Sequence, residues 1–376
     1  MLQNQKQSII RNSSIELLRI IAMIMIVFHH FAVHGGFSWE SSSVSFTRYW
    51  YNFIIMGGKI GVDVFVIISG YYLINSNSGY IKFDKIAKFV GQVFFYSVTL
   101  YLISCLTGIS DLNIKSLIKV LFPITFSQWW FASTYFVLFL LHPFLNRLLH
   151  ILDKAAYQKL LLVLVVCWSV IPTFTTSSFQ GNSLLWFITL YSISGYIRLY
   201  GLNSKFTAKH YFIFLLIGSL LTYGSSIAFT MLGKKWSFFS ARATYFYGQE
   251  KITTLLTSLC LFMLFVTIKM NYHRWINVVA SATFGVYLIH DNNIVRPLLW
   301  ESWFKNAQYQ ESLYLIPYSI IAVTIVYVVC TFIDLLRQKL IDKPFLIIVN
   351  RYSVKIMRPV NILIDLVMNI VFGKQD

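Results

Sequence analysis

Four ionisable residues, Glu16, Arg19, His29 and His30, lie in one otherwise apolar stretch, ELLRIIAMIMIVFHHF, which covers residues 16–31, and two of them are eleven positions apart. These two residues are Arg19 and His30. Eleven residues make close to three turns of an α-helix, so both side chains share one face, about 16 Å apart along the axis. Arginine can hold a phosphate through its planar guanidinium, and histidine can exchange protons near neutral pH. One helical stripe therefore offers an anion-binding group and a proton-handling group.

Simpler interpretations of this stretch stay open. Arg19 can extend toward the membrane surface and pair with Glu16, three residues earlier on the same face, and His30 can be a packed side chain. A metal site made of His30 and His34, four residues apart, lacks a nearby Asp or Glu, because Asp63 belongs to another span. We therefore expect no metal.

The composition indicates a polytopic membrane protein. Hydrophobic residues make up 57% of the 376 residues and charged residues 12%, and the mean hydropathy is +0.65. A soluble domain carries about 25% charged residues. The sequence predicts an all-α fold of about ten membrane-spanning helices of ~20 residues each, placed at 14–34, 52–74, 86–108, 129–149, 158–177, 183–200, 210–232, 251–269, 277–293 and 312–336.

The basic residues predict the orientation of these spans. With the N-terminus inside, 20 of the 31 Lys and Arg residues lie on the cytoplasmic side and ten outside, and Arg19 lies within a span. Cytoplasmic loops are normally the more basic ones, so both termini are expected inside. The net charge of +17 then binds anionic lipid and does not indicate nucleic-acid binding. We expect one transmembrane domain at 1–343 and a basic amphipathic tail at 344–376, interfacial over about 344–373.

Further candidate residues lie in other spans. Asp63 is a carboxylate within the second span, where such a group is rare and commonly functional; its alternative is a structural pair with Lys59, one turn earlier. His290 and Asp291 end the ninth span, with Arg296 five residues beyond Asp291. They form a second candidate site for proton handling or acceptor binding, or else a satisfied helix end.

Two tryptophans and the four cysteines are the remaining residues that could have a functional role. Trp129 and Trp130 fit an aromatic belt at the outer interface, although aromatic rings also stack on sugars. The cysteines are scattered without paired spacing, so they are expected to be packed residues. The first apolar run lacks a small-residue cleavage site, so we expect no cleaved signal peptide.

Two segments resemble motifs of the membrane acyltransferase family 3. Arg19 and His30 match the Arg-x10-His signature of its first helix. The second span, GGKIGVDVFVIISGYYLI, is similar to its second motif. Weaker similarities follow in WWFASTYFVLFLLHPFLN and FGVYLIHDN. Because the ten-span layout also agrees, the resemblance covers nearly the whole chain; the residues that match the second motif are Gly61, Asp63, Ser69, Gly70 and Tyr71.

The chain departs from the family pattern at two places. Relatives often carry an arginine cluster soon after the second motif, where this chain has Lys82, Lys85 and Lys88. Lysine attracts phosphate but cannot bind it through a planar fork. Many relatives also carry a C-terminal esterase-like domain, whereas this chain has a short basic tail. The membrane domain itself is then expected to meet the acceptor.

The resemblance implies an integral membrane O-acyltransferase of the bacterial plasma membrane. Acetyl-CoA would be the cytoplasmic donor, and a sugar hydroxyl of a surface polysaccharide the acceptor. His30 is the expected general base, although an acetyl-histidine intermediate stays open. Arg19 and Asp63 are expected beside His30 on the donor path, and the oligomeric state is left open. The remaining expected contacts are Lys82, Lys85 and Lys88 with the CoA phosphates, and Trp129, Trp130, His290 and Asp291 with the acceptor.

Two other classes of protein stay open. Charges within the membrane also mark the path of a transporter or flippase for a glycan or lipid-linked sugar. Such a transporter is expected to show internal repeats or matching broken helices, and the sequence shows neither. A structural partner in a glycan-synthesis complex is the third possibility.

Overall fold

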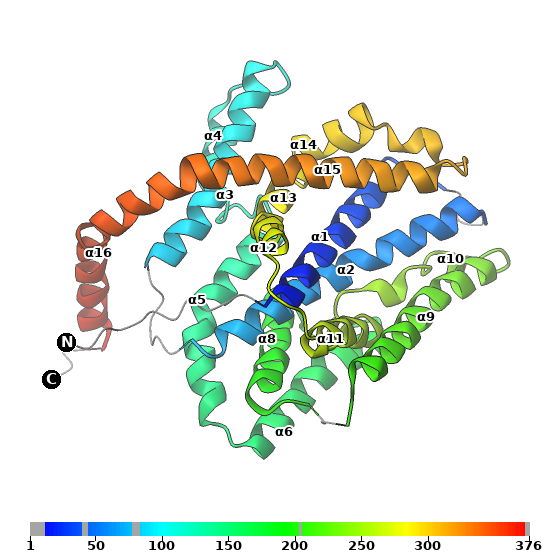
Figure 1. The fold of residues 1–376 in the computed structure, drawn as a ribbon, viewed down its shortest axis with the longest axis horizontal. Coiled ribbons are helices and arrows are strands. Elements are labelled where there is room, and N and C mark those ends of the chain that lie inside the picture. Colours follow the sequence, from blue (N-terminus) through cyan, green and yellow to red (C-terminus); the bar gives the residue numbers. More distant parts are fainter. Residues whose placement is uncertain (1–11, 40–43, 77–82, 203–204, 373–376) are drawn as a thin grey trace.

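The computed structural model describes residues 12–39, 44–76, 83–202 and 205–372. These residues form helices and turns, with no strand in the described part of the chain. Figure 1 shows α1 and α2 side by side at the centre of the molecule, with α15 lying across them. The α-helices are α1 (Ser13–Val33), α2 (Phe46–Leu73), α3 (Phe83–Leu106), α4 (Ile114–Leu121), α5 (Trp130–Ile151), α6 (Lys154–Val165), α7 (Ile171–Phe174), α8 (Ser183–Tyr200), α9 (Ala208–Leu232), α10 (Ser237–Ser240), α11 (Ile252–Thr267), α12 (Arg274–Ser281), α13 (Thr283–His290), α14 (Val295–Pro297), α15 (Leu315–Arg337) and α16 (Lys343–Phe372).

Eight helical stretches within the described residues are long and apolar enough to cross a membrane. The prediction of an all-helical, multi-pass membrane protein is therefore confirmed. Two expected spans are not among the eight: 183–200 corresponds to α8, and 277–293 is divided between α12 and α13. The count of about ten spans and the cytoplasmic termini stay predictions.

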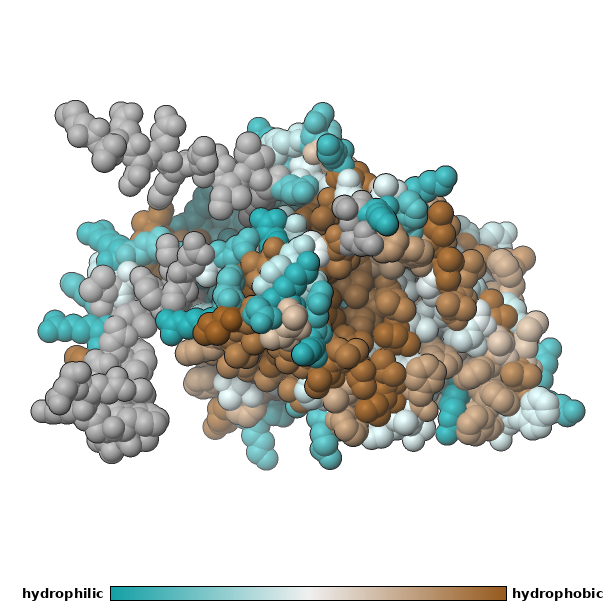
Figure 2. All heavy atoms as spheres, turned by 90° about the horizontal axis from the view of Figure 1, so that it is seen from below, coloured by the Kyte–Doolittle hydropathy of each residue, from teal (hydrophilic) through white to brown (hydrophobic). Residues whose placement is uncertain are grey.

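Lipid-facing surface is evident on the peripheral helices. α9 exposes large apolar side chains along its length, and α15 does the same over its outer face. Figure 2 shows apolar side chains covering the middle of one face, with hydrophilic side chains gathered mainly toward one end. Contiguous exposed apolar surface of this extent does not occur on soluble monomers, but in a bilayer it faces acyl chains.

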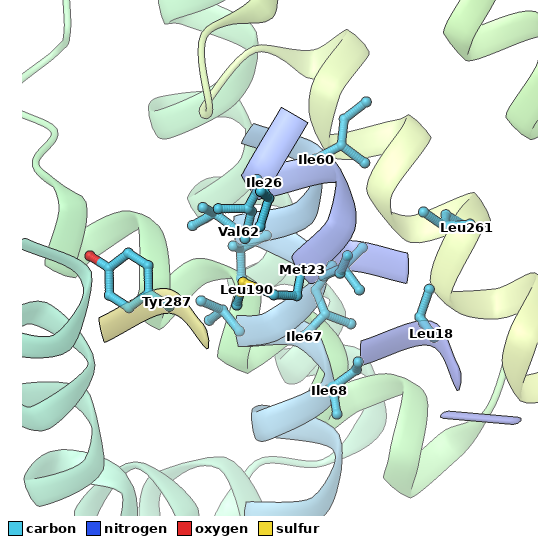
Figure 3. Packing of buried hydrophobic residues seen from close by; sticks show 14 of the residues in the cluster. Leu18, Met23, Ile26, Ile60, Val62, Ile67, Ile68, Leu190, Leu261 and Tyr287 are labelled. Carbon is cyan, nitrogen blue, oxygen red and sulfur yellow. The ribbon is translucent and has the colours of Figure 1, made fainter. Parts of the chain in front are cut away.

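α1 and α2 pack unusually closely because glycines of α2 face α1. A Cβ atom on Gly61 would lie 2.6 Å from the carbonyl oxygen of Ala22, and one on Gly58 would lie 2.2 Å from Cγ of His29. Small residues let two helix backbones approach in this way within a membrane. Figure 3 shows the buried apolar residues of this region, with side chains from α1, α2 and neighbouring helices packed together.

Hydrogen bonds between distant segments define two ends of the bundle. At the first end, Ser14 Oγ donates to the carbonyl of Phe265 at 2.5 Å. At the second, Asn306 Nδ2 donates to the carbonyl of Phe31 at 3.0 Å. Arg19 lies toward the first end of α1 and His30 toward the second, so we name them the Arg19 end and the His30 end.

Two amphipathic segments lie outside the central bundle. The region 111–128, in which Lys115 and Lys119 lie among apolar residues, contains the short helix α4. The tail forms the long helix α16, which contains Pro359. Figure 1 shows the last part of α16 turning away from the rest of this helix, as expected for an interior proline, which removes a hydrogen bond and bends the axis.

Candidate active site

A cavity of about 360 Å³ runs beside α1 and contains both residues of the first motif in its lining. Its apolar middle is formed by side chains such as Met23, Ile26 and Val62, which Figure 3 shows close together on α1 and α2. The rest of the lining combines polar and charged side chains with aromatic rings such as Phe89 and Phe131. The complete lining is Arg19, Met23, Ile26, His30, Val62, Phe65, Ser69, Lys88, Phe89, Gln92, Trp130, Phe131, Tyr135, Ala280, Ser281, Thr283, Phe284, Tyr287, Arg337, Gln338 and Asp342.

At the His30 end of this cavity, His30 lines the wall and pairs with a second imidazole, His290, which is not a lining residue. His30 Nδ1 lies 2.9 Å from His290 Nε2, and His290 Nδ1 lies 2.6 Å from the carbonyl oxygen of Val286. A carbonyl only accepts, so neutral His290 carries its proton on Nδ1 and accepts through Nε2. His30 must then donate from Nδ1, which leaves its Nε2 unprotonated. This tautomer is assigned from the hydrogen-bond pattern, and it provides a free basic nitrogen.

A carboxylate and a guanidinium lie directly behind this pair. Asp291 Oδ1 is 3.7 Å from His30 Nδ1 and 3.8 Å from His34 Nε2, and it accepts a hydrogen bond of 3.2 Å from Arg296 Nη1. A carboxylate in this position stabilises the imidazolium that forms when His30 gains a proton. Burial and, next, the charge of Arg296 lower the pKa of His34 to about 4, so the His34 ring is neutral near pH 7.

The expectation that no carboxylate accompanies His30 and His34 is wrong. The fold brings Asp291 to them, and one ligand atom from each of the three residues lies within 4.8 Å of the others. The local sequence does not reveal this contact, because 261 positions separate His30 and Asp291. Arg296 contacts two of the three groups, Asp291 at 3.2 Å and His34 at 3.4 Å. The Arg296 guanidinium thus occupies the position beside the carboxylate in which a metal ion would bind.

At the other end of the cavity, Arg19 is only loosely held. Its Nε lies 4.0 Å from Glu16 Oε2, which agrees with the expected pairing, but this buried nitrogen has no hydrogen-bond partner in the described structure. Lys88 lines the same cavity, whereas Lys85 does not. Lys82 lies outside the described residues. Arg19 and Lys88 are therefore the two cations, of the expected set, that the structure brings to the cavity.

Asp63 is placed differently from Arg19 and His30. It is fully buried, does not line the cavity, and accepts a hydrogen bond of 3.0 Å from the indole Nε1 of Trp186. Lys59 Nζ lies 5.2 Å from the centre of the Trp130 ring, a cation–π contact. Trp130 lines the cavity, while Trp129 is buried in the core and so does not lie at a lipid interface.

A buried ionic cluster at the Arg19 end was absent from the sequence-based candidates. Arg337 Nε donates to Asp334 Oδ1 at 2.8 Å, and its Nη1 also binds Asp342. Tyr96 and Gln92 donate to the same Asp334 oxygen at 2.8 and 3.2 Å. Three of these residues, Gln92, Arg337 and Asp342, line the cavity. In the sequence, this cluster is indicated only by Asp334 and Arg337, which lie three residues apart at the end of an apolar helix.

The fold and this cavity define a multi-pass membrane protein with a buried histidine pair inside the helical bundle. The family described as an acyltransferase domain, acyltransferase family 3, matches residues 12–333. The chain therefore belongs to this family and is a membrane acyltransferase. Comparison with curated proteins and with solved structures gave no match.

Proposed function

We propose that the protein transfers an acetyl group from cytoplasmic acetyl-CoA to a sugar hydroxyl of an exported or cell-surface polysaccharide, in a bacterial plasma membrane. One observation carries this proposal. A single cavity is lined by Arg19 and Lys88 toward one end and by His30 toward the other, and His290 contacts His30 from outside the lining. A donor that is anionic at one end and reactive at the other matches this order of groups.

The donor phosphates would lie at the Arg19 end. The unpartnered Nε of Arg19 can bind a phosphate oxygen, and Lys88 adds a second positive charge. Lys82 and Lys85 belong to the same proposal as cations that attract CoA from the cytoplasm. The apolar middle of the cavity would hold the uncharged arm of CoA, which places the thioester near His30.

His30 is the proposed general base. Its unprotonated Nε2 takes the proton of the acceptor hydroxyl while that oxygen attacks the thioester carbonyl carbon. The carbon–sulfur bond then breaks, and the imidazolium returns the proton to the thiolate of CoA. The products are an O-acetyl ester and CoA-SH. His290 holds the His30 ring in the required tautomer, and Asp291 stabilises the imidazolium, as the acid of a catalytic triad does.

The acceptor would approach from the His30 end. Trp130 is the tryptophan that lines the cavity, and Trp129, His290 and Asp291 belong to the same proposed acceptor region. Asp63 is a proposed positioning residue here, because it fixes the Trp186 indole on the neighbouring helix α8.

The proposal is tested on cells that lack the protein, complemented with wild type or with the His30→Ala variant. Ester-linked acetyl groups on the extracted surface polysaccharide are measured by mass spectrometry before and after mild alkali. We expect acetyl esters with wild type only. Equal acetylation in both strains would overturn the proposed base. Polysaccharide that disappears from the surface without any change in acetylation would instead support the transporter class.

A further inference from the structure

A second hollow, separate from the cavity beside α1, lies at the His30 end. Its volume is about 220 Å³, below the ~300–1,000 Å³ usual for drug-sized ligands, so it suits one small ring. The segment between α7 and α8 and the segment before α11 form it. We name it the outer pocket; its lining is Trp168, Ser178, Gly181, Asn182, Ser183, Trp186, Gln249 and Glu250.

The lining of the outer pocket combines indole rings with neutral hydrogen-bonding groups. Trp168 and Trp186 supply the rings, and amides, hydroxyls and one carboxylate supply the polar atoms. The indole Nε1 of Trp168 is buried and has no hydrogen-bond partner in the described structure. A buried N–H without an acceptor costs free energy unless a ligand or a water molecule supplies the missing hydrogen bond. A sugar ring offers what this set requires, because it has C–H faces for the indoles and hydroxyls for the polar groups.

Charge in the outer pocket disfavours an anionic ligand. Glu250 is the charged residue of the lining. Its neighbour Lys251 pairs with it at 3.3 Å and also donates to the carbonyl of Pro172 at 2.5 Å. No lining residue is a cation that could neutralise a phosphate or carboxylate. The pocket therefore selects a neutral or amino-substituted sugar.

The segment that closes the outer pocket is held in an uncommon backbone conformation. Phe179 and Gln180 have φ angles of 47° and 58°, a left-handed region that non-glycine residues adopt at some cost. A Cβ on the next residue, Gly181, would lie 2.8 Å from the Ser178 carbonyl and 3.1 Å from Cδ1 of Trp168. The segment is thus fixed tightly against one of the two indoles.

The outer pocket is connected by a hydrogen bond to helix α2, which also carries residues of the cavity wall. Trp186, in the pocket wall, donates to Asp63 of α2 at 3.0 Å. One turn earlier on α2, Lys59 contacts Trp130, which lines the cavity beside α1. Asp63 and Lys59 thus connect the wall of the outer pocket with the lining of the cavity through α2.

We propose that the outer pocket is an acceptor subsite, which binds a neutral or amino sugar adjacent to the one that receives the acyl group. The identification of the bound sugar as part of the acceptor rests on the proposed function. Sugar binding by the pocket can nevertheless be measured without turnover. Gln249 and Trp168 provide the hydrogen-bonding groups, and Trp186, positioned by Asp63, provides a stacking surface.

Binding is tested with the purified His30→Ala protein in detergent micelles and with polysaccharide extracted from host cells that lack the protein. Saturation-transfer NMR reports contacts to sugar protons. Gln249→Ala and Trp168→Phe are compared with Gln308→Ala and Trp236→Phe, which change the same residue types at exposed positions outside the pocket. We expect affinity for the polysaccharide to fall about tenfold in the two pocket variants and to be unchanged in the two controls.

A kinetic assay on the active protein separates this inference from the proposed function. With radiolabelled acetyl-CoA and the same polysaccharide, the pocket variants should raise KM for polysaccharide about tenfold and leave KM for acetyl-CoA unchanged, which also shows that they fold. Unchanged polysaccharide binding and KM in both pocket variants would overturn the subsite while leaving the acetyl transfer intact. Sugar binding that depends on Gln249, without any acetyl transfer by wild type, would retain the pocket and refute the proposed function.

Discussion

The hydrogen bond between two imidazoles determines which nitrogen of His30 can act as a base. His290 is fixed by the Val286 carbonyl, so His30 donates from Nδ1 and keeps Nε2 free. His290→Ala removes this constraint without touching His30. We expect kcat to fall about 10²-fold, within the range for a misplaced general base, with KM for acetyl-CoA unchanged. Single-turnover acetyl transfer by the purified variants measures this effect.

His290→Gln is the matched variant for this prediction. A glutamine can accept from His30 through its carbonyl oxygen, so partial recovery of kcat relative to His290→Ala is expected. Equal activity of His290→Ala and wild type would show that the imidazole pair has no role in the chemistry. Loss of acetyl-CoA binding in His290→Ala would indicate a folding role instead.

Arg19→Lys separates donor binding from chemistry. Lysine keeps the positive charge but loses the bidentate geometry of the guanidinium. We expect KM for acetyl-CoA to rise about tenfold, the cost of one charge-assisted hydrogen bond, with kcat little changed. Titration of acetyl-CoA into wild-type and variant protein measures the affinity. An unchanged dissociation constant would remove Arg19 from the donor site.

At the scale of helices, the close contact of α1 and α2 positions the cavity wall. Gly61→Ala would place a methyl 2.6 Å from the Ala22 carbonyl and 3.0 Å from Ile26 Cγ1. Because a backbone atom must move, we expect a destabilisation of about 1–3 kcal/mol, which exceeds the ~1 kcal/mol that alanine gains in a helix. Thermal unfolding in detergent should show a lower midpoint.

Gly224→Ala in α9 is the control for Gly61→Ala. No atom lies within 4 Å of a Cβ added at Gly224, so only the gain in helix propensity applies, and the midpoint should stay equal or rise. A lower midpoint in both variants would mean that glycine in any span of this protein is needed for reasons other than close packing. Equal midpoints in Gly61→Ala and wild type would refute the packing argument.

The helical periodicity of the sequence predicts which residues share a face, but not which helices meet. The eleven-residue spacing of Arg19 and His30 indicated their common stripe, and both line one cavity. In contrast, the partners of His30 lie 260 and 261 positions away, in and just after α13. Nothing local in the sequence encodes that contact. The same reason explains the missed Asp334–Arg337–Asp342 cluster, whose members become significant only when they border the cavity.

At the scale of the whole molecule, the proposed chemistry requires the two ends of the cavity to face opposite sides of the membrane. The Arg19 end must open to cytoplasmic acetyl-CoA and the His30 end to the exported acceptor. The apolar middle of the cavity, with residues such as Met23, Ile26 and Val62, would limit leakage of ions between them. The predicted distribution of 20 basic residues inside and ten outside, which assumes the ten-span layout, agrees with this direction.

Two single cysteines, placed on a cysteine-free background, test this orientation. Ser237→Cys lies at the start of α10, and Asn271→Cys lies in the segment between α11 and α12; both positions are exposed. With the N-terminus inside, Ser237→Cys should react with an impermeant thiol reagent on intact cells, and Asn271→Cys should react only after the cells are opened. The variants must first retain acetyl transfer. The opposite labelling pattern would place His30 on the cytoplasmic side and exclude transfer across the membrane, because donor phosphates and acceptor would then approach from the wrong faces.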